Sequence, residues 1–162
     1  MDWAIVTEAP LAVRVHIGAA LAAITLGPVA IFRHSRDWLH HGAGALWVFV
    51  MGVLAISGLL IPASLFPLIG PFGPIHLLSL WALWSLSVGL AALWRGQRAK
   101  HGAEMRALYW QGLALAGLLT LLPGRRLNRL LFGEVPMMGL WIICLVALAL
   151  AILLVRRRVL AK

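Results

Sequence analysis

The stretch from Ala43 to Phe66 reads AGALWVFVMGVLAISGLLIPASLF and contains no charged side chain. A helix needs about 20 mostly apolar residues to cross the hydrocarbon core of a bilayer, and this stretch supplies them. The rest of the chain has the same character, since hydrophobic residues make up 62% of its 162 residues and charged residues only 12%. Soluble domains have about twice that charged fraction. The composition therefore indicates an integral membrane protein.

Five such apolar stretches follow one another, separated by residues that favour turns. Each stretch is uniformly apolar rather than alternating, so each is predicted to be a helix and not a strand of a barrel. The predicted fold is an all-α integral membrane helix bundle, a single membrane domain over residues 1–162. Four histidine-bearing helices form its core, and a C-terminal helix follows. The approximate spans are 11–32, 43–66, 75–94, 105–122 and 135–155.

The distribution of positive charge indicates the orientation of these spans. Most Arg and Lys residues lie in the loops after the first and third spans and in the C-terminal tail. Such loops stay in the cytoplasm, which places the N-terminus outside. The first span lacks the basic start and the cleavage site of a signal peptide, so it is expected to be retained. The net charge of +9 lies in loops and the tail, which indicates contact with anionic lipid rather than nucleic acid.

One basic segment does not fit this orientation. With five crossings, Arg125, Arg126 and Arg129 fall on the outer side. Either this hairpin is tolerated, or the fourth span is re-entrant, or these arginines serve a negatively charged group. Arg125 and its neighbours would suit the propionates of a haem, because guanidinium binds carboxylates in a bidentate way. A solvated loop explains them equally well.

The histidines lie at alternating ends of successive spans. His16 and His76 begin the first and third spans at one membrane face, whereas His40 and His101 precede the second and fourth at the other. Histidine is a common axial ligand of haem iron, and ionisable residues in membrane segments are candidates for function. The layout therefore predicts two b-type haems. His16 and His76 would ligate the outer iron, and His40 and His101 the inner one.

Other interpretations of these histidines stay open. His34 and His41 compete with His40 as the inner ligand. Histidines at a membrane interface also cap helices or contact lipid headgroups, and proton transfer is a further role. A zinc site is disfavoured, because zinc needs three or four clustered ligands. No nucleophile–base pair, phosphate-binding loop or carboxylate dyad is present, and none of the five acidic residues lies well inside a predicted span.

Several short motifs resemble the DUF2306 family of predicted bacterial membrane proteins. The run HHGAGALWV from His40 is similar to the family's HR-x-x-G-x-x-W-V helix opening, and PIHLLS at 74–79 is similar to a family helix entry. The segments KHGAEM at 100–105, LPGR at 122–125 and LFG at 131–133 extend the resemblance over about residues 15–133. The resemblance implies a multi-pass protein of the bacterial inner membrane and favours His40 over His41. His41, Gly102 and Ala103 stand where the family has arginine.

Two functions are consistent with this layout, which also resembles that of b561-type di-haem cytochromes. The first is a b-type haem protein or redox subunit that transfers electrons between quinone, or a partner protein, and another redox centre. The alternative is a cofactor-free accessory or structural subunit of a larger respiratory or photosynthetic membrane complex. Both predict the lipid bilayer and other membrane subunits as partners, and neither predicts nucleic acid.

Overall fold

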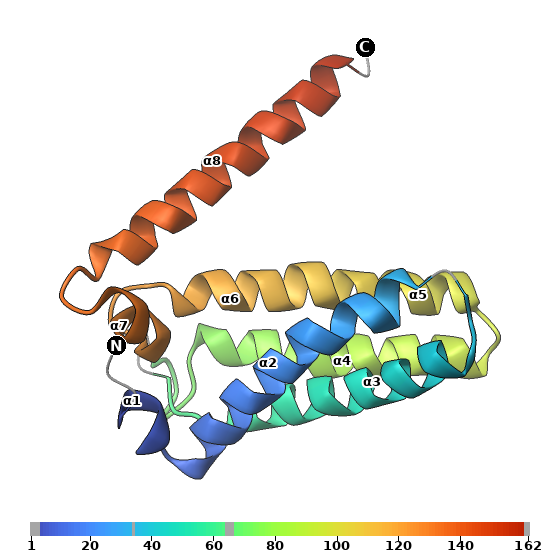
Figure 1. Ribbon diagram of the computed structural model, residues 1–162, viewed down its shortest axis with the longest axis horizontal. Helices are drawn as coiled ribbons and strands as arrows, with labels where there is room; N and C mark the ends of the chain where they lie inside the picture. The colour runs from blue at the N-terminus through green and yellow to red at the C-terminus, as the bar shows by residue number, and fades with distance from the viewer. Residues whose placement is uncertain (1–3, 34, 64–66, 161–162) are drawn as a thin grey trace. The chain divides into compact units, whose positions relative to one another are not determined.

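The computed structural model describes residues 4–33, 35–63 and 67–160 (Figure 1). Over these residues the regular structure is helical, apart from an isolated antiparallel bridge between Ile69 and Phe72. The prediction of an all-α fold is therefore confirmed. The helices are α1 (Ala4–Thr7), α2 (Leu11–Phe32), α3 (Trp38–Leu59), α4 (Pro74–Trp94), α5 (Arg98–Ala107), the π-helical segment η1 (Leu108–Leu113), α6 (Ala114–Thr120), α7 (Arg126–Phe132) and α8 (Met137–Leu160).

The chain divides into two compact units. The larger unit, Val6–Ala116, contains every histidine of the sequence. The smaller unit includes the segment from Gly117 onward, with α7 and α8. The single membrane domain over 1–162 stays a prediction.

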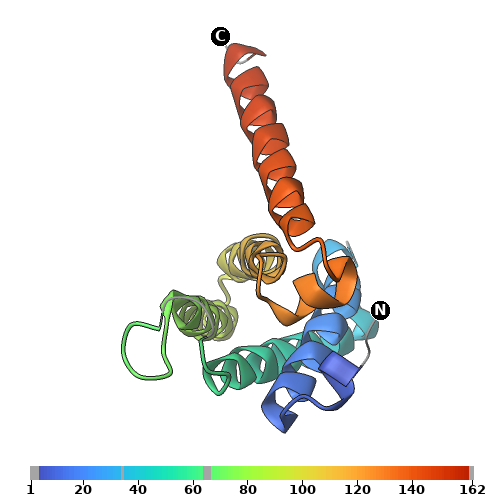
Figure 2. The ribbon, with the colours of Figure 1, turned by 90° about the vertical axis from the view of Figure 1, so that its left-hand side faces the viewer.

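The larger unit is a ring of helices. α3 packs against α2 and α4, and the continuous helix made of α5 and η1 packs against α4 and α2. Figure 2, which looks along the unit, shows these helices as neighbours around a common core. The order of packing sets α2 diagonally opposite α4, and α3 diagonally opposite α5. Helices that carry paired histidines therefore face each other diagonally, as expected for an up-and-down bundle.

Large side chains fill the middle of this bundle. Trp47 of α3 is 1% exposed and Leu108 of η1 is fully buried, with Met51 and Met105 packed in the same core. The Trp47 Nε1–H donates a hydrogen bond of 3.0 Å to the carbonyl of Ala23 on α2. This core separates the two ends of the bundle, so that sites at the two ends are distinct.

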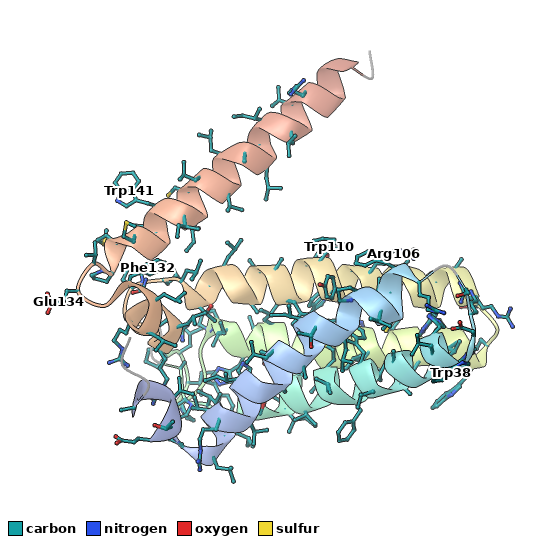
Figure 3. All side chains as sticks on the ribbon, in the orientation of Figure 1. Trp38, Arg106, Trp110, Phe132, Glu134 and Trp141 are labelled. Atoms are coloured by element: carbon teal, nitrogen blue, oxygen red, sulfur yellow. The ribbon has the colours of Figure 1, made fainter. Side chains whose placement is uncertain are left out.

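The membrane character of the helices is clear from their length and composition. Over the described residues, α2, α3 and α4 are long and apolar enough to cross a membrane, and α7 with α8 makes a fourth span if this pair, bent by 102°, counts as one. Five separate crossings are not confirmed. Large apolar side chains cover the outside of the helices. Examples are Trp38, Trp110 and Trp141, whose side chains point away from their helices (Figure 3). Such a surface is suited to contact with lipid.

Two helices begin earlier than the predicted spans. α3 begins at Trp38 rather than at 43 and ends at Leu59, while residues 64–66 of the predicted span lie outside the described residues. The fourth helix begins at Arg98 rather than at 105, because its charged first turns are helical although they are not apolar. Hydropathy indicates which residues can lie in lipid, but helical hydrogen bonding extends beyond them. α8 likewise runs to Leu160, past the predicted end at 155.

Asp37 fixes the start of α3. Its carboxylate accepts a hydrogen bond of 3.1 Å from the backbone N–H of His40 and forms an ion pair with Arg33. The hydrogen-bonded Arg33 guanidinium, followed by the His40 N–H, holds the pKa of the Asp37 carboxyl well below its usual range. The side chain is therefore ionised at neutral pH and caps the exposed N–H groups of the helix. This cap sets the position of His40 in the first turn.

In the smaller unit, a buried asparagine braces the bend between α7 and α8. Asn128 is fully buried, and its Nδ2 donates hydrogen bonds to the carbonyls of Leu121, at 2.6 Å, and Pro136, at 2.9 Å. Gly139 permits this close approach, because a Cβ there would overlap the carbonyl of Leu121. The asparagine thereby satisfies carbonyls on both sides of the bend.

Candidate functional site

At one end of the bundle, His101 of α5 is anchored to α4. Its Nδ1 lies 2.9 Å from the carbonyl oxygen of Gly89. A carbonyl only accepts, so Nδ1 carries the proton and Nε2 is left with its lone pair. Gly89 lies against α5, where an added Cβ would meet the movable terminal methyl group of Met105. A histidine that donates one N–H to a backbone carbonyl has the orientation and tautomer of a metal ligand.

His40, on α3, lies at the same end. Its side chain is half-buried, and its Nδ1 is a buried nitrogen without a hydrogen-bond partner in the described part of the chain. The ring also hydrogen-bonds the backbone of Ala30, and Arg36, His41 and His101 lie near enough for their charges to act on it. Buried polar atoms are normally hydrogen-bonded, and an exception calls for an explanation such as a functional role or a missing ligand.

The neighbours of His40 in the sequence differ from it in structure. His41 is exposed, and its Nδ1 lies 2.7 Å from the backbone carbonyl of Asp37, to which it donates at the start of α3. It therefore acts at the helix surface. His34, the other alternative, lies outside the described residues. Of His40 and His41, it is His40 that has a buried ring nitrogen.

At the other end of the bundle, both ring nitrogens of His76 are hydrogen-bonded to backbone groups. The side chain is 4% exposed. Its Nε2 lies 3.1 Å from the carbonyl of Ile61, to which it donates, and its Nδ1 accepts a bond of 3.0 Å from the N–H of Gly73. A neutral imidazole has one donor and one acceptor nitrogen. Both are used here, so His76 fastens the start of α4 to the connection that follows α3.

His16, on α2, contacts the last turns of α3. Its Nδ1 lies 3.1 Å from the carbonyl of Leu54 and 3.2 Å from the Ser57 hydroxyl. The Ser57 hydroxyl donates to the same Leu54 carbonyl at 3.0 Å. Gly58 lies against the ring, and a Cβ there would come within 3.2 Å of its Cε1. The Leu54 contact gives Nδ1 the proton, so Nε2 of His16 keeps its lone pair.

The histidines thus occupy the two ends of α3 in pairs. His16 and His76 bind backbone at or just beyond its C-terminal end, and His40 with His101 lies at its N-terminal end. The inner pair combines a buried nitrogen without a partner and an imidazole anchored by its Nδ1–H. In the outer pair, His76 has no ring nitrogen left for a ligand unless it releases the Ile61 carbonyl.

A buried polar contact near His101 was missed by the sequence reasoning. Ser85 of α4 is 2% exposed, and its hydroxyl donates a hydrogen bond of 2.9 Å to Oε2 of Glu104. Glu104 follows His101 by three residues and so shares its helix face. The prediction that the fourth span begins at 105 left Glu104 outside the membrane segment. The spacing of His101 and Glu104 was the signal that could have identified it. Over the described residues, no three His, Cys, Asp or Glu side chains group as a metal site.

Arg125 belongs to the smaller unit. It immediately precedes α7, and its side chain is partly buried there. Burial lowers the pKa of its guanidinium. Pairing of Arg125 with a haem propionate stays a prediction.

Replacing His76 with alanine should destabilise the bundle. The buried Gly73 N–H and Ile61 carbonyl lose their partner, which costs about 1–3 kcal/mol for each group left unsatisfied. Glutamine at the third helical position can reach back to the N-cap N–H, so His76→Gln should recover part of this loss. Thermal unfolding of both variants in the same detergent measures the difference. Equal melting temperatures for the wild type and His76→Ala would contradict the anchoring role.

The same two variants test the predicted outer haem. Neither alanine nor glutamine replaces an imidazole ligand, so both would lose one haem equally if His76 binds iron. The two roles of His76 can be separated, because glutamine should restore stability through the helix cap but should not restore haem binding.

Comparisons of the sequence with family models, with curated proteins and with solved structures gave no match. The similarity to the DUF2306 proteins therefore stays a prediction from the motifs alone.

Proposed function

We propose that this chain is an integral membrane redox subunit that binds one b-type haem at the inner end of its helix bundle, between His40 and His101. The observation that supports this proposal is the buried Nδ1 of His40, which has no hydrogen-bond partner in the described residues. Its ring lies within electrostatic range of His101. Two imidazoles on diagonally opposed helices are the donor set that a six-coordinate b-type haem requires.

The surroundings of the pair suit this group. The Gly89 carbonyl holds His101 in one tautomer and one orientation, which leaves Nε2 as the donor atom. Arg36 lies close enough to His40 to interact with its charge, and guanidinium can bind a carboxylate such as a haem propionate. Trp47, Met105 and Leu108 fill the core beyond the pair and exclude water from that side. A bound haem would supply one-electron transfer.

A single inner haem is a narrower proposal than the two haems suggested by the sequence. His76 already uses both ring nitrogens, so an outer haem requires a rearrangement of the connection between α3 and α4. By the positive-inside rule, the inner end faces the cytoplasm and the N-terminus lies outside. Electron exchange with quinone or with a partner subunit is part of the same proposal.

The second candidate is a cofactor-free accessory subunit of a larger membrane complex. It is favoured by the fact that His16, His41, His76 and His101 each hydrogen-bond a backbone carbonyl. These contacts give each of the four a purely structural role. The long apolar surface of α8 also suits packing against other membrane helices. Under this hypothesis the buried Nδ1 of His40 is left without a role.

An absorption spectrum separates the two candidates. The protein is expressed with an adequate haem supply, purified in mild detergent and recorded before and after reduction with dithionite, with a pyridine haemochrome count. The inner-site proposal predicts a b-type spectrum and about one haem per chain. A spectrum without haem bands would overturn it and favour the accessory subunit. A count of about two would bring His16 and His76 back as ligands.

A further inference from the structure

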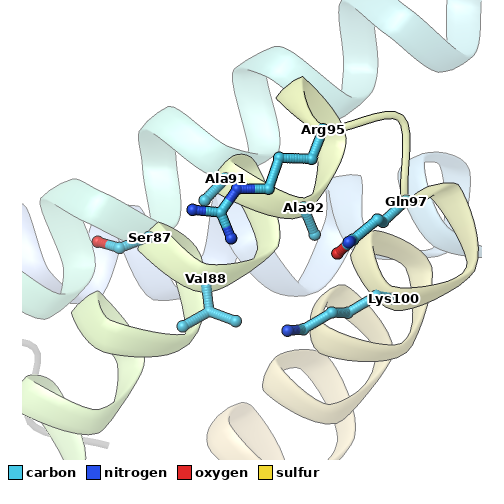
Figure 4. A pocket seen from close by; sticks show the side chains of 7 residues that line it. All are labelled: Ser87, Val88, Ala91, Ala92, Arg95, Gln97 and Lys100. Atoms are coloured by element: carbon cyan, nitrogen blue, oxygen red, sulfur yellow. The ribbon is translucent and has the colours of Figure 1, made fainter.

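A shallow pocket lies at the turn between α4 and α5, apart from the histidines. Its floor, on α4, consists of the apolar residues Val88, Ala91 and Ala92 with the Ser87 hydroxyl beside them. Arg95 and Lys100 stand on either side of it, with their charged groups directed toward Val88 (Figure 4). The pocket therefore joins an apolar surface to two positive charges.

The two cations have no acidic partner. Both side chains are exposed, and neither has a hydrogen bond or ion pair in the described part of the chain, where the ion pair found is the one between Arg33 and Asp37. The charge of the pocket is therefore uncompensated. Gln97 makes no side-chain hydrogen bond at the start of α5, so the positive end of that helix adds to the field.

The pocket lies where a lipid headgroup would be. α4 is a candidate membrane span that ends at Trp94, and Trp94 is 84% exposed beside Arg95. Exposed tryptophans at span ends mark the interface between lipid and water. Below the pocket, Leu77, Leu80 and Trp84 are exposed on one side of α4 at spacings of three and four residues. They continue the apolar floor toward the middle of the span.

We propose that this pocket binds the phosphate of an anionic phospholipid, with Arg95 and Lys100 as its ligands and an acyl chain along the apolar face of α4. Basic pockets between membrane helices on the cytoplasmic side are the known form of such sites. A phospholipid satisfies both features, because its phosphate meets the cations and its chains cover Val88 and the residues below. Free phosphate would satisfy only the first. The assignment is independent of haem binding.

Native mass spectrometry of the full chain in detergent tests the proposal, with phosphatidylglycerol and phosphatidylcholine as separate probes and inorganic phosphate as a competitor. The wild type should prefer phosphatidylglycerol. The double variant Arg95→Gln/Lys100→Gln should lower that affinity about 10–30-fold, given the contribution of each cation near an anionic surface. Val88→Trp keeps both charges but fills the pocket, and it should also weaken phosphatidylglycerol binding.

The control variant is Arg14→Gln/Arg106→Gln, which removes the same charge at exposed positions of α2 and α5 that do not line the pocket. It should leave the affinity within about twofold of the wild type, since surface charge at a distance is screened. Equal loss in the two double variants, or an unchanged affinity in Val88→Trp, would mean a diffuse charge effect and overturn the site. Equal binding of the two lipids, or displacement by low-millimolar phosphate, would overturn the assignment to a phospholipid.

Discussion

The His101→Gln variant should purify as a folded helix bundle with its haem content reduced about tenfold or more. The glutamine amide can donate to the Gly89 carbonyl, as the Nδ1–H of His101 does in the wild type, so the contact between α5 and α4 is retained. It offers iron no imidazole nitrogen. His40→Gln should cause the same loss, because a bis-histidine site needs both ligands. Haem per chain is measured by pyridine haemochrome, and folding by circular dichroism.

His41→Gln is the matched control for this pair. His41 adjoins His40 in the sequence but is exposed and contacts the Asp37 carbonyl. Its replacement should leave the haem content and the spectrum unchanged. Retention of haem by both His40→Gln and His101→Gln, with loss in a His16 variant instead, would contradict the inner site and assign the haem to the outer end.

The Trp47→Ala variant should lose about 3–5 kcal/mol of stability. Trp47 is 1% exposed in the middle of the core, and its indole N–H is bonded to the Ala23 carbonyl. Alanine leaves a cavity among Met51 and Leu108 that helices on four sides cannot close. In lipid the transfer of apolar surface contributes little, so the lost packing contacts account for most of the effect.

Two further variants separate the packing of Trp47 from its hydrogen bond. Trp47→Phe keeps most of the ring and loses the N–H donor, which should cost about 1–3 kcal/mol because the Ala23 carbonyl loses its partner. Trp94→Ala removes an indole that is 84% exposed and should change the midpoint of thermal unfolding little. If Trp47→Ala unfolded at the same temperature as Trp94→Ala, the core would not be packed as described.

Much of the fold follows from hydropathy, whereas helix ends do not. The apolar stretches identified α2, α3 and α4 because a spanning helix must satisfy its own backbone groups. The early start of the fourth helix at Arg98 was not predictable in this way, since its first turns are charged. The bend between α7 and α8 depends on Asn128 and Gly139, whose contacts with Leu121 join three different segments of the chain. Single-residue contacts of this kind leave no periodic pattern.

The candidate site was predictable in its layout and not in its chemistry. The spacing of the four histidines along the chain placed each near the start of its helix and successive ones at opposite ends of the bundle, as the structure has them. It gave no information about their hydrogen bonds, because the Gly89 and Ile61 carbonyls that orient His101 and His76 come from neighbouring helices or loops. Glu104 was not identified, because it lies in the charged first turns of α5, which hydropathy excluded from the fourth span.

The π-helical segment between Leu108 and Leu113 has a consequence for how this helix can change. A π-helical turn accommodates one more residue than the α-helical path it replaces, and each residue turns an α-helix by about 100°. Deleting one residue there would let the helix become regular with both halves in their present orientation. If the segment became α-helical with all its residues, one half would rotate by about 100° relative to the other. His101 would then leave Gly89, or Gly112 would leave Trp81. The π-helical segment therefore sets the rotation between the two parts of this helix. It lets His101, in the polar first part, contact Gly89 while Gly112, in the apolar part, packs against Trp81.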